Sequence, residues 1–309
     1  MPGSTVPRHD KTGNDRLSLE RQPRSFHHSS YSVARIAAER AERALGVSVC
    51  LPARECAGTV GGIVESLGEL RTAGAIDEIV VVDAASEDGT ATVAERAGAV
   101  VRQEAELMAA YGPVLGKGDA MWRALSVLEG EVVCFLDADT EGFSAHFLTG
   151  LIGPLVCEPG VSFVKAFYRR PLADGAGPPG AQGGGRVNHL LARPALELFY
   201  PALAGVRQPL AGEVAARREL LERLPFATGY GVEIAMLIDV WREVGLDGIA
   251  QVDLDEHRNR HQPLSALEPM ALTVLATIAG RLEGEGRLRS EASAHAPAER
   301  PPFASVRVA

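Results

Sequence analysis

The sequence lacks a hydrophobic segment long enough to cross a membrane. No run of about 18 uncharged apolar residues occurs in it. The most apolar candidate, residues 234–241, is interrupted by Asp239. Residues 1–30 are polar and have no apolar core, unlike a secretory signal peptide. We therefore expect a cytoplasmic protein with no membrane partner.

Cysteine and positive charge are also scarce. None of the four cysteines forms a CxxC pair, and Cys50 and Cys134 lie inside apolar runs, where cysteine acts as a small buried hydrophobe. This usage fits a reducing compartment. The net charge of -9 argues against nucleic acid as a partner, because a phosphate backbone recruits clustered Lys and Arg. A small anionic substrate stays possible, since an acidic protein can hold a local basic pocket.

Two familiar motifs are absent as well. Residues 112–118 are not a P-loop, because the glycine spacing is one short and no Ser or Thr follows Lys117. Lys117 between two glycines at a helix start would still suit a phosphate, and the alternative is a flexible surface loop. Residues 256–261 contain two histidines without the HExxH arrangement, which excludes a zincin-like site but leaves His257 open as a single ligand.

What is present is an alternation of apolar strands and helices. Strands are expected at residues 47–51, 79–82, 99–101 and 132–136, and helices at 59–70, 90–97 and 118–128. Continuous apolar strands separated by helices predict a mostly parallel, Rossmann-like α/β sheet that is buried on both faces. Ligands of such sheets bind at the carboxyl ends of the strands, where this chain has Glu55, Asp83 and the pair Asp137 and Asp139.

The second half is less regular. A strand is expected at residues 161–169, a Gly- and Pro-rich loop at 171–185, helices at 187–199, 230–244 and 264–279, and a strand at 249–252. We expect one domain over residues 31–282. Residues 1–30 and 283–309 have the composition of disordered tails.

Three segments suggest chemistry, each with a structural alternative. Asp137-Ala138-Asp139 follows a buried strand and can share a divalent cation with phosphate oxygens, or it can simply cap a turn. Residues 83–90 can present Asp83 or Ser86 to a base or ribose, or cap the next helix. Residues 183–188 combine three glycines with Arg186, which suits an anion, or form a linker.

Taken together, these segments resemble the glucosyl-3-phosphoglycerate synthases and the related mannosyl-3-phosphoglycerate synthases, which are retaining glycosyltransferases of GT-A fold. The resemblance covers roughly residues 46–280, in family order. It implies a GT-A domain over residues 31–282, with residues 46–140 as the nucleotide-sugar-binding half and residues 141–282 as the acceptor-binding half. The segments that carry it are residues 51–55, 83–90, 116–118, 137–139, 164–172, 183–187, 208–213, 229–234 and 257–259. The Gly-Gly-Gly-Arg, Tyr-Gly-Val-Glu-Ile and His-Arg-Asn segments are more specific than the Asp-Ala-Asp motif.

The resemblance implies a role for each matching residue. Asp139 and His257 would hold Mg²⁺, with Mn²⁺ possible, and Asp139, Glu233 and Lys117 would be the catalytic groups. The donor-binding residues would be Pro52, Ala53, Glu55, Asp83, Ser86, Lys117, Asp137, Ala138 and Tyr230. The acceptor-binding residues would be Gly185, Arg186, Val187, Asn188 and Asn259. The family works as a homodimer.

The implied reaction moves glucose from UDP-glucose to the 2-hydroxyl of 3-phosphoglycerate with retention of configuration. GDP-mannose is the alternative donor. A nucleotidyltransferase is disfavoured because residues 52–55 are not a Gly-rich loop, and a non-catalytic nucleotide-sugar-binding regulator would not need both Asp139 and His257. The chain departs from the family pattern at Asn188, usually Thr, and at Asp255, where a basic residue is common.

Overall fold

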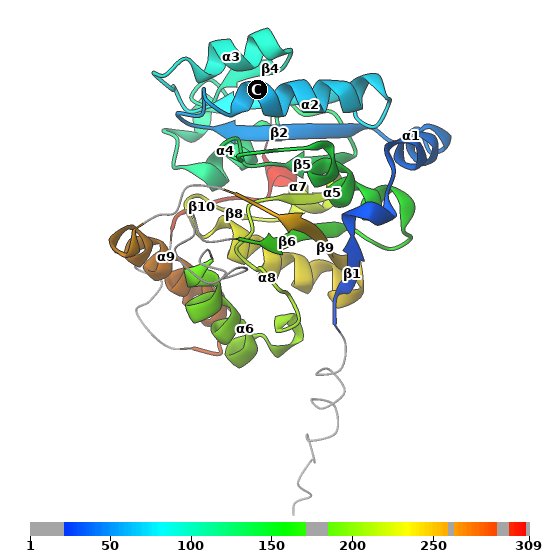
Figure 1. Ribbon diagram of the computed structural model, residues 1–309. Helices are drawn as coiled ribbons and strands as arrows, with labels where there is room; N and C mark the ends of the chain where they lie inside the picture. The colour runs from blue at the N-terminus through cyan, green and yellow to red at the C-terminus, as the bar shows by residue number, and fades with distance from the viewer. Residues whose placement is uncertain (1–21, 171–184, 259–262, 289–296, 307–309) are drawn as a thin grey trace, which may run out of the picture.

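A single eight-stranded sheet organises the chain (Figure 1). The computed structural model describes residues 22–170, 185–258, 263–288 and 297–306. The strand order is β1-β9-β6-β7-β5-β2-β3-β4, and only β7 runs antiparallel to its neighbours. The strands are β1 (Arg24–His27), β2 (Val47–Ala53), β3 (Glu78–Asp83), β4 (Val100–Gln103), β5 (Val132–Phe135), β6 (Phe163–Arg169), β7 (Val214–Arg217) and β9 (Ile249–Glu256).

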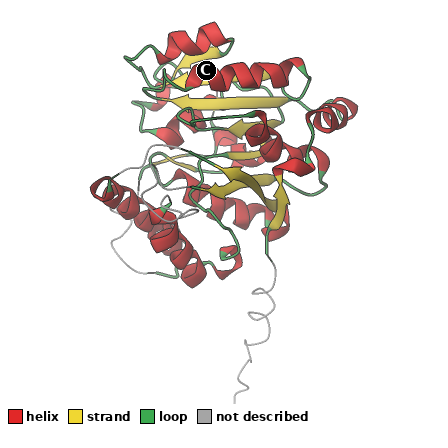
Figure 2. Cartoon of the chain, viewed as in Figure 1, coloured by secondary structure: helices red, strands yellow, loops and turns green. Residues whose placement is uncertain are grey.

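Helices cover both faces of this sheet (Figure 2). One apolar core contains residues of α1 (Val33–Glu42), α2 (Val60–Thr72), α3 (Thr90–Ala97) and α5 (Ala145–Cys157). The other contains residues of α4 (Lys117–Ala124), α6 (Arg193–Phe199), α7 (Arg218–Arg223), α8 (Val232–Val244) and α9 (Leu264–Gly284). Successive strand residues enter opposite cores: Val81 joins the first, while Val80 and Val82 join the second. This alternation explains why the strands are apolar throughout.

Short elements complete the fold. They are η1 (His28–Ser30), η2 (Ala109–Tyr111), the π-helical turn η4 (Asn188–Ala192), η5 (Pro201–Leu203), η6 (Leu246–Gly248), η8 (Phe303–Ser305) and a two-stranded sheet of β8 (Phe226–Ala227) with β10 (Glu299–Arg300). None of the described helices is long and apolar enough to span a bilayer.

The predicted alternation in the first half is confirmed, because every expected strand and helix there is present. The second half matches less closely. The expected helix at residues 187–199 divides into η4 and α6, and the sequence reading omitted α5, α7, β7 and β8. Strand β7 has only four residues and runs antiparallel to its neighbours. It therefore does not belong to the alternation of parallel strands and helices on which the prediction rested.

The prediction of a disordered tail over residues 1–30 is wrong for the described residues 22–30. Residues 24–27 form β1, an edge strand that pairs in parallel with β9. Tyr31 then packs over α5, where a Cβ on Gly153 would lie 2.2 Å from the tyrosine ring. The glycine therefore permits this close approach. The sequence pattern did not predict β1, because the strand is short and partly polar.

The prediction of a second disordered tail over residues 283–309 is also wrong for the described residues 297–306. Arg300 pairs through Nε and Nη2 with the two carboxylate oxygens of Asp119, at 2.6 and 2.7 Å. Trp122 Nε1 donates to Pro301 O at 2.9 Å, and Phe303 packs edge-on against the Trp122 ring. The C-terminal segment is thus attached to α4, the helix that begins with Lys117.

The Arg300–Asp119 pair is buried, so breaking it should destabilise the protein strongly. Burial alone would raise the pKa of Asp119, but hydrogen bonds from Arg300 and Arg123 outweigh it and lower that pKa. Arg300→Ala leaves this carboxylate without its bidentate partner. We expect the free energy of unfolding to fall by about 3 kcal/mol in chemical denaturation.

A matched control is Arg43→Ala. Arg43 pairs with Glu39 on the surface of α1, with side-chain exposures of 43% and 34%. Its loss should cost less than about 1 kcal/mol. An equal decrease in the free energy of unfolding in the two variants would show that the buried Arg300–Asp119 pair stabilises the protein no more than a surface ion pair does.

Candidate active site

The sheet topology collects polar side chains at one edge. Strands β2, β3, β5, β6 and β9 all run in the same direction, so their carboxyl ends lie at the same edge. Strand β7 runs the other way, which places its first residue, and Gly212 and Glu213 before it, at that edge too. This is the edge at which open α/β sheets bind ligands.

Two loops at this edge, after β2 and β3, are bonded to each other. Glu55 N donates to Ser86 Oγ at 2.9 Å, and Glu87 N donates to Glu55 Oε1 at 2.9 Å. Ser86 N and Gln103 Nε2 both donate to Asp83 Oδ2, each at 3.1 Å. The other oxygen, Asp83 Oδ1, is buried and has no hydrogen-bond partner among the described residues. Asp83 therefore offers a free acceptor for an N–H group.

Lys117 lies between two carboxylates from different parts of the chain. Its Nζ is 2.6 Å from Asp137 Oδ1 and 3.1 Å from Glu233 Oε1. Lys117 begins α4, Asp137 follows β5 and Glu233 is in the first turn of α8. Burial alone would lower the pKa of Lys117, but Asp137 and Glu233 outweigh it and raise that pKa well above its ordinary value. Lys117 is therefore a permanent cation that holds both carboxylates.

Asp139 differs in its surroundings from Asp137. Its side chain reaches solvent, yet the surrounding protein excludes much of the water, and this desolvation raises its pKa, with a further contribution from Asp137. Ala138 between them is buried, and its carbonyl accepts from Thr59 Oγ1 at 2.7 Å. The structure thus presents Asp139 as the accessible carboxylate of the motif.

His257 is buried and held from several sides. Its Nε2 is 2.8 Å from Glu213 Oε1 and 3.3 Å from Thr140 Oγ1. The Tyr168 ring stacks on the imidazole at 4.5 Å, and the Tyr168 hydroxyl donates to Glu213 Oε2 at 2.7 Å. Burial alone would lower the pKa of His257, but Glu213 outweighs it and raises that pKa. His257 Nδ1 is buried and without a hydrogen-bond partner among the described residues.

The sequence reading gave no role to Glu213, Tyr168 or the neighbouring cations. Burial and Glu213 raise the pKa of Tyr168, so its hydroxyl remains a donor, and Arg170 Nη2 donates to that hydroxyl at 2.8 Å. Lys165 is fully buried and donates to Ala211 O at 2.8 Å; burial lowers its pKa to about 8. These residues fall in the segments 164–172 and 208–213, whose likeness to the family was the only available signal.

The loops that carry Asp139 and His257 run side by side. Glu141 N donates to Arg258 O at 3.1 Å, and Thr140, the residue after Asp139, contacts His257. Within the described residues, neither Asp139 nor His257 belongs to a group of three His, Cys, Asp or Glu side chains whose possible metal-ligand atoms lie within 4.8 Å of one another. The two loops thus bring the chain segments of Asp139 and His257 together, and Asn259 lies outside the described residues.

The remaining predicted residues differ in exposure and in the contacts they make. Gly185 has a φ of 73°, which favours glycine, and it precedes Arg186 at intermediate exposure. The Asn188 amide is engaged with backbone, donating to Arg207 O at 3.3 Å and accepting from Leu210 N at 3.4 Å. Tyr230 is exposed. Pro52 and Ala53 end β2, and Val187 is buried.

Comparison with known proteins gives the class first. Residues 48–179 match Glycosyl transferase family 2, and this span contains the loops with Glu55, Asp83 and Asp137. The overall fold matches a mannosyl-3-phosphoglycerate synthase structure from Rubrobacter xylanophilus with a TM-score of 0.85 and 43% identity, over 94% of this chain and 99% of that one. The fold and site therefore define a glycosyltransferase of GT-A architecture.

The family follows from two further relatives. A glucosyl-3-phosphoglycerate synthase of Mycolicibacterium paratuberculosis is 43% identical over 84% of this chain and 78% of its own length. A structure of the Mycobacterium tuberculosis glucosyl-3-phosphoglycerate synthase with Mn²⁺, UDP-glucose and phosphoglyceric acid has a TM-score of 0.79 and 36% identity, over 91% of this chain and 98% of that one. This chain belongs to the glucosyl-3-phosphoglycerate synthase family, and the expected resemblance is confirmed.

Gly212 leaves room for the Lys117–Asp137 pair and provides a test of the site geometry. A Cβ at Gly212 would lie 2.5 Å from Asp137 Oδ2 and 2.7 Å from Lys117 Nζ. Gly212→Ala should displace both groups, costing about 1–3 kcal/mol of stability. Because an error of about 1 Å in a catalytic group can cost roughly 100-fold in rate, we expect a loss of that order in steady-state turnover.

Gly68→Ala is the matched control. Gly68 lies within α2, and a Cβ there would meet nothing within 4 Å. This variant should keep full turnover and be at least as stable as the parent, since alanine favours helix. Wild-type turnover in a folded Gly212→Ala protein would contradict the importance of this packing.

Proposed function

We propose that this chain transfers glucose from UDP-glucose to the 2-hydroxyl of 3-phosphoglycerate, with retention of configuration. The observation that carries the proposal is the convergence of Lys117, Asp137 and Glu233 beside the Glu213–His257 pair, at the ligand-binding edge of the sheet. The family membership supports the same reaction, since relatives at about 40% identity are glucosyl-3-phosphoglycerate synthases.

The residues fit a divalent cation shared with the donor diphosphate. His257 Nδ1 is an unpartnered nitrogen, and Glu213 on the opposite ring nitrogen would fix the tautomer, as carboxylates do behind metal-bound histidines. The accessible Asp139 would be the second protein ligand, and a hard cation takes its remaining oxygens from phosphate and water. When bound, the cation neutralises charge on the departing diphosphate. We propose Mg²⁺ as the ion, with Mn²⁺ as a substitute.

Donor recognition is assigned to the loops after β2 and β3. Asp83 Oδ1, buried and unpartnered, would accept a hydrogen bond from a base N–H. Glu55 and Ser86 are held against each other and would face the ribose or base. Pro52, Ala53, Ala138 and Tyr230 would shape the rest of the donor pocket, with Lys117 and Asp137 beside the sugar or diphosphate.

The chemical step depends on stabilising the leaving diphosphate as the glucose acquires positive charge. Lys117 is a permanent cation at this place, and its position is set before substrate arrives, which is the condition for efficient electrostatic stabilisation. Glu233 forms an ion pair with the Lys117 ammonium and would orient the sugar and the acceptor hydroxyl. A proton from the 2-hydroxyl can pass to the leaving phosphate on the same face, which keeps the configuration without an enzymic nucleophile.

The acceptor site is assigned to Gly185, Arg186, Val187, Asn188 and Asn259. An arginine binds phosphate or carboxylate through two parallel hydrogen bonds, which suits the two anionic ends of 3-phosphoglycerate. The Asn188 side chain is already bonded to the backbone of residues 207–210, so its contribution would be to shape the loop unless it reorients.

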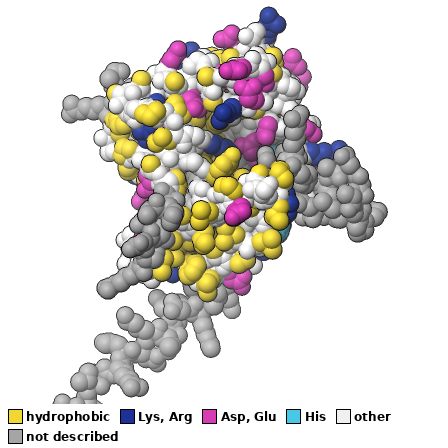
Figure 3. All heavy atoms as spheres, turned by 90° about the vertical axis from the view of Figure 1, so that its left-hand side faces the viewer, with side chains coloured by type: hydrophobic (Ala, Val, Ile, Leu, Met, Phe, Trp, Pro, Cys, Tyr) yellow, Lys and Arg dark blue, Asp and Glu magenta, His cyan; other side chains and the backbone are white. Residues whose placement is uncertain are grey.

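We also infer a cytoplasmic homodimer. All four cysteines are free, which suits a reducing compartment. Of the large hydrophobic side chains that are exposed in the described residues, five lie on η4, α6 and α9: Leu190, Leu198, Leu264, Leu272 and Leu275. Figure 3, in which the left-hand side of Figure 1 faces the viewer, shows apolar atoms gathered over the lower half of that side of the molecule. An exposed apolar surface of this kind suits a subunit contact.

GDP-mannose is the second candidate donor, because a mannosyl-3-phosphoglycerate synthase shares the fold at 43% identity. A panel of UDP-glucose and GDP-mannose, each with 3-phosphoglycerate and Mg²⁺, separates the two by released nucleotide. We expect release with UDP-glucose at a rate at least about tenfold above GDP-mannose, a difference of about 1.4 kcal/mol in transition-state binding. Faster nucleotide release with GDP-mannose would show that the protein is a mannosyltransferase. Nucleotide release with neither donor would refute 3-phosphoglycerate as the acceptor.

Metal dependence is tested with EDTA and with Asp139→Asn. Chelation should stop turnover, and added Mg²⁺ or Mn²⁺ should restore it. Asp139→Asn should lower turnover at least about 100-fold while the melting temperature stays close to that of the parent, because the exposed side chain contributes mainly to leaving-group stabilisation. Glu39→Gln on the surface of α1 is the charge-matched control and should keep full activity. Full activity in excess chelator would exclude a metal-dependent reaction.

A further inference from the structure

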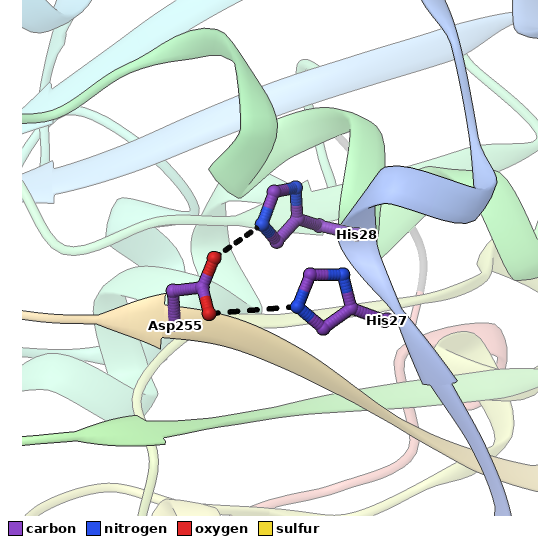
Figure 4. Close-up of side chains that lie close together, drawn as sticks. All are labelled: His27, His28 and Asp255. Atoms are coloured by element: carbon purple, nitrogen blue, oxygen red, sulfur yellow. Dashed lines mark hydrogen bonds and ion pairs between the residues drawn. The ribbon is translucent and has the colours of Figure 1, made fainter.

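Two histidines and an aspartate meet beside the candidate active site, outside the residues assigned to it. His28 Nε2 is 2.7 Å from Asp255 Oδ2, and His27 Nε2 is 3.5 Å from Asp255 Oδ1 (Figure 4). One donor atom from each residue lies within 4.8 Å of the others. All three side chains reach solvent, with exposed fractions of 44% for His27, 18% for His28 and 48% for Asp255.

The backbone explains why two consecutive histidines point the same way. His27 ends β1, where it pairs with Asp253 of β9, and His28 begins η1. The strand stops between them, so the usual alternation of side chains across a sheet no longer applies. Asp255 has a φ of 63°, a left-handed conformation that aspartate tolerates, and its N–H bonds Asp253 Oδ1 at 2.9 Å. Figure 4 shows both imidazoles directed at its carboxylate.

The donor set and spacing suit a transition metal better than Mg²⁺. Imidazole nitrogen is a preferred ligand of Zn²⁺ and its neighbours, and two histidines with one carboxylate leave a position for water. Two ligand atoms on a tetrahedral Zn²⁺ lie about 3.4 Å apart, close to the His27–Asp255 separation of 3.5 Å. The shorter His28–Asp255 contact is a hydrogen bond that needs to open slightly. His27 Nδ1 accepts from Ser29 N at 3.3 Å and lies 2.8 Å from Ser29 Oγ. Binding of an ion through Nε2 therefore requires the ring proton to move to Nδ1, where Ser29 Oγ can accept it in place of the Ser29 N contact.

Neighbouring groups do not block this site. Arg169 Nη2 is 3.9 Å from Asp255 Oδ1, but its side chain is 65% exposed and can swing into solvent. His146 lies against His28, with ring centroids 4.4 Å apart, yet its Nε2 is at 3.2 Å from Leu254 O and its Nδ1 at 2.5 Å from Ser144 Oγ. His146 therefore packs beside the cluster with both nitrogens engaged elsewhere.

We propose that His27, His28 and Asp255 form an accessory site for a divalent transition-metal ion of the zinc class, separate from the metal that accompanies the donor diphosphate. A bound ion would fasten the N-terminal strand to the end of β9, two residues before His257. Packed rings continue the connection: His28 contacts His146, His146 contacts Phe147 and Phe147 contacts His257. The site goes beyond the proposed reaction, since it requires neither donor nor acceptor.

The test is Co²⁺ binding to the nucleotide-free protein, followed by visible absorption and titration calorimetry, with Zn²⁺ as competitor. We expect one tight ion per chain in the parent and in Asp139→Asn, because Asp139 belongs to the other site. His28→Gln and His27→Gln should each weaken binding at least tenfold, since each removes one of three ligands. His146→Gln, which changes a neighbouring histidine with no free nitrogen, should bind like the parent.

Melting temperatures without metal establish that each variant is folded. His27→Gln decides the matter if His28→Gln unfolds, because the His27 side chain is largely exposed and its contact with Asp255 is long. Absence of tight Co²⁺ binding in the parent would overturn the proposal, as would unchanged affinity in His27→Gln or loss of binding in Asp139→Asn. None of these outcomes depends on turnover, so the result is independent of which sugar donor the protein uses.

Discussion

The site depends first on the ammonium of Lys117, whose side chain is 29% exposed. It joins Asp137, which follows β5, to Glu233, in the first turn of α8, at distances of 2.6 and 3.1 Å. Two carboxylates so close to one another would repel in a partly dehydrated site, and the cation between them removes that penalty. The helix that carries Lys117 is in turn fixed by the C-terminal segment through Asp119. Residues far apart in the sequence thus hold Lys117 and the helix that carries it in place.

Strand β7 supplies the second constraint. Because it alone runs against the rest of the sheet, its leading residues Gly212 and Glu213 arrive at the edge where the other strands end. Gly212 makes room for the Lys117–Asp137 pair, and Glu213 fixes His257. A parallel strand in this position would have brought its last residues there instead. The reversal therefore determines which side chains support the candidate metal ligands.

The parts predicted from sequence share a physical reason. Asp83, Asp137 and Asp139 follow continuous apolar strands, so local pattern alone predicts both the strand and the position of the polar group at its end. Glu213, Tyr168 and Lys165 are polar residues buried within the sheet region, and their partners lie far away in sequence, so pattern gives no signal. β1 and β10 were missed because four and two residues carry too little periodicity, and their burial depends on β9, α5 and α4.

The surroundings of His257 show how the fold orients a candidate metal ligand in the absence of substrate. One imidazole nitrogen, Nε2, contacts Glu213 and Thr140. The ring stacks on Tyr168 and meets Phe147 edge-on. Of the polar atoms of this side chain, Nδ1 alone has no hydrogen-bond partner among the described residues. Each contact removes an orientation that the free side chain would have. The cost in conformational entropy is therefore met during folding, and binding energy from the substrates remains available for the chemical step.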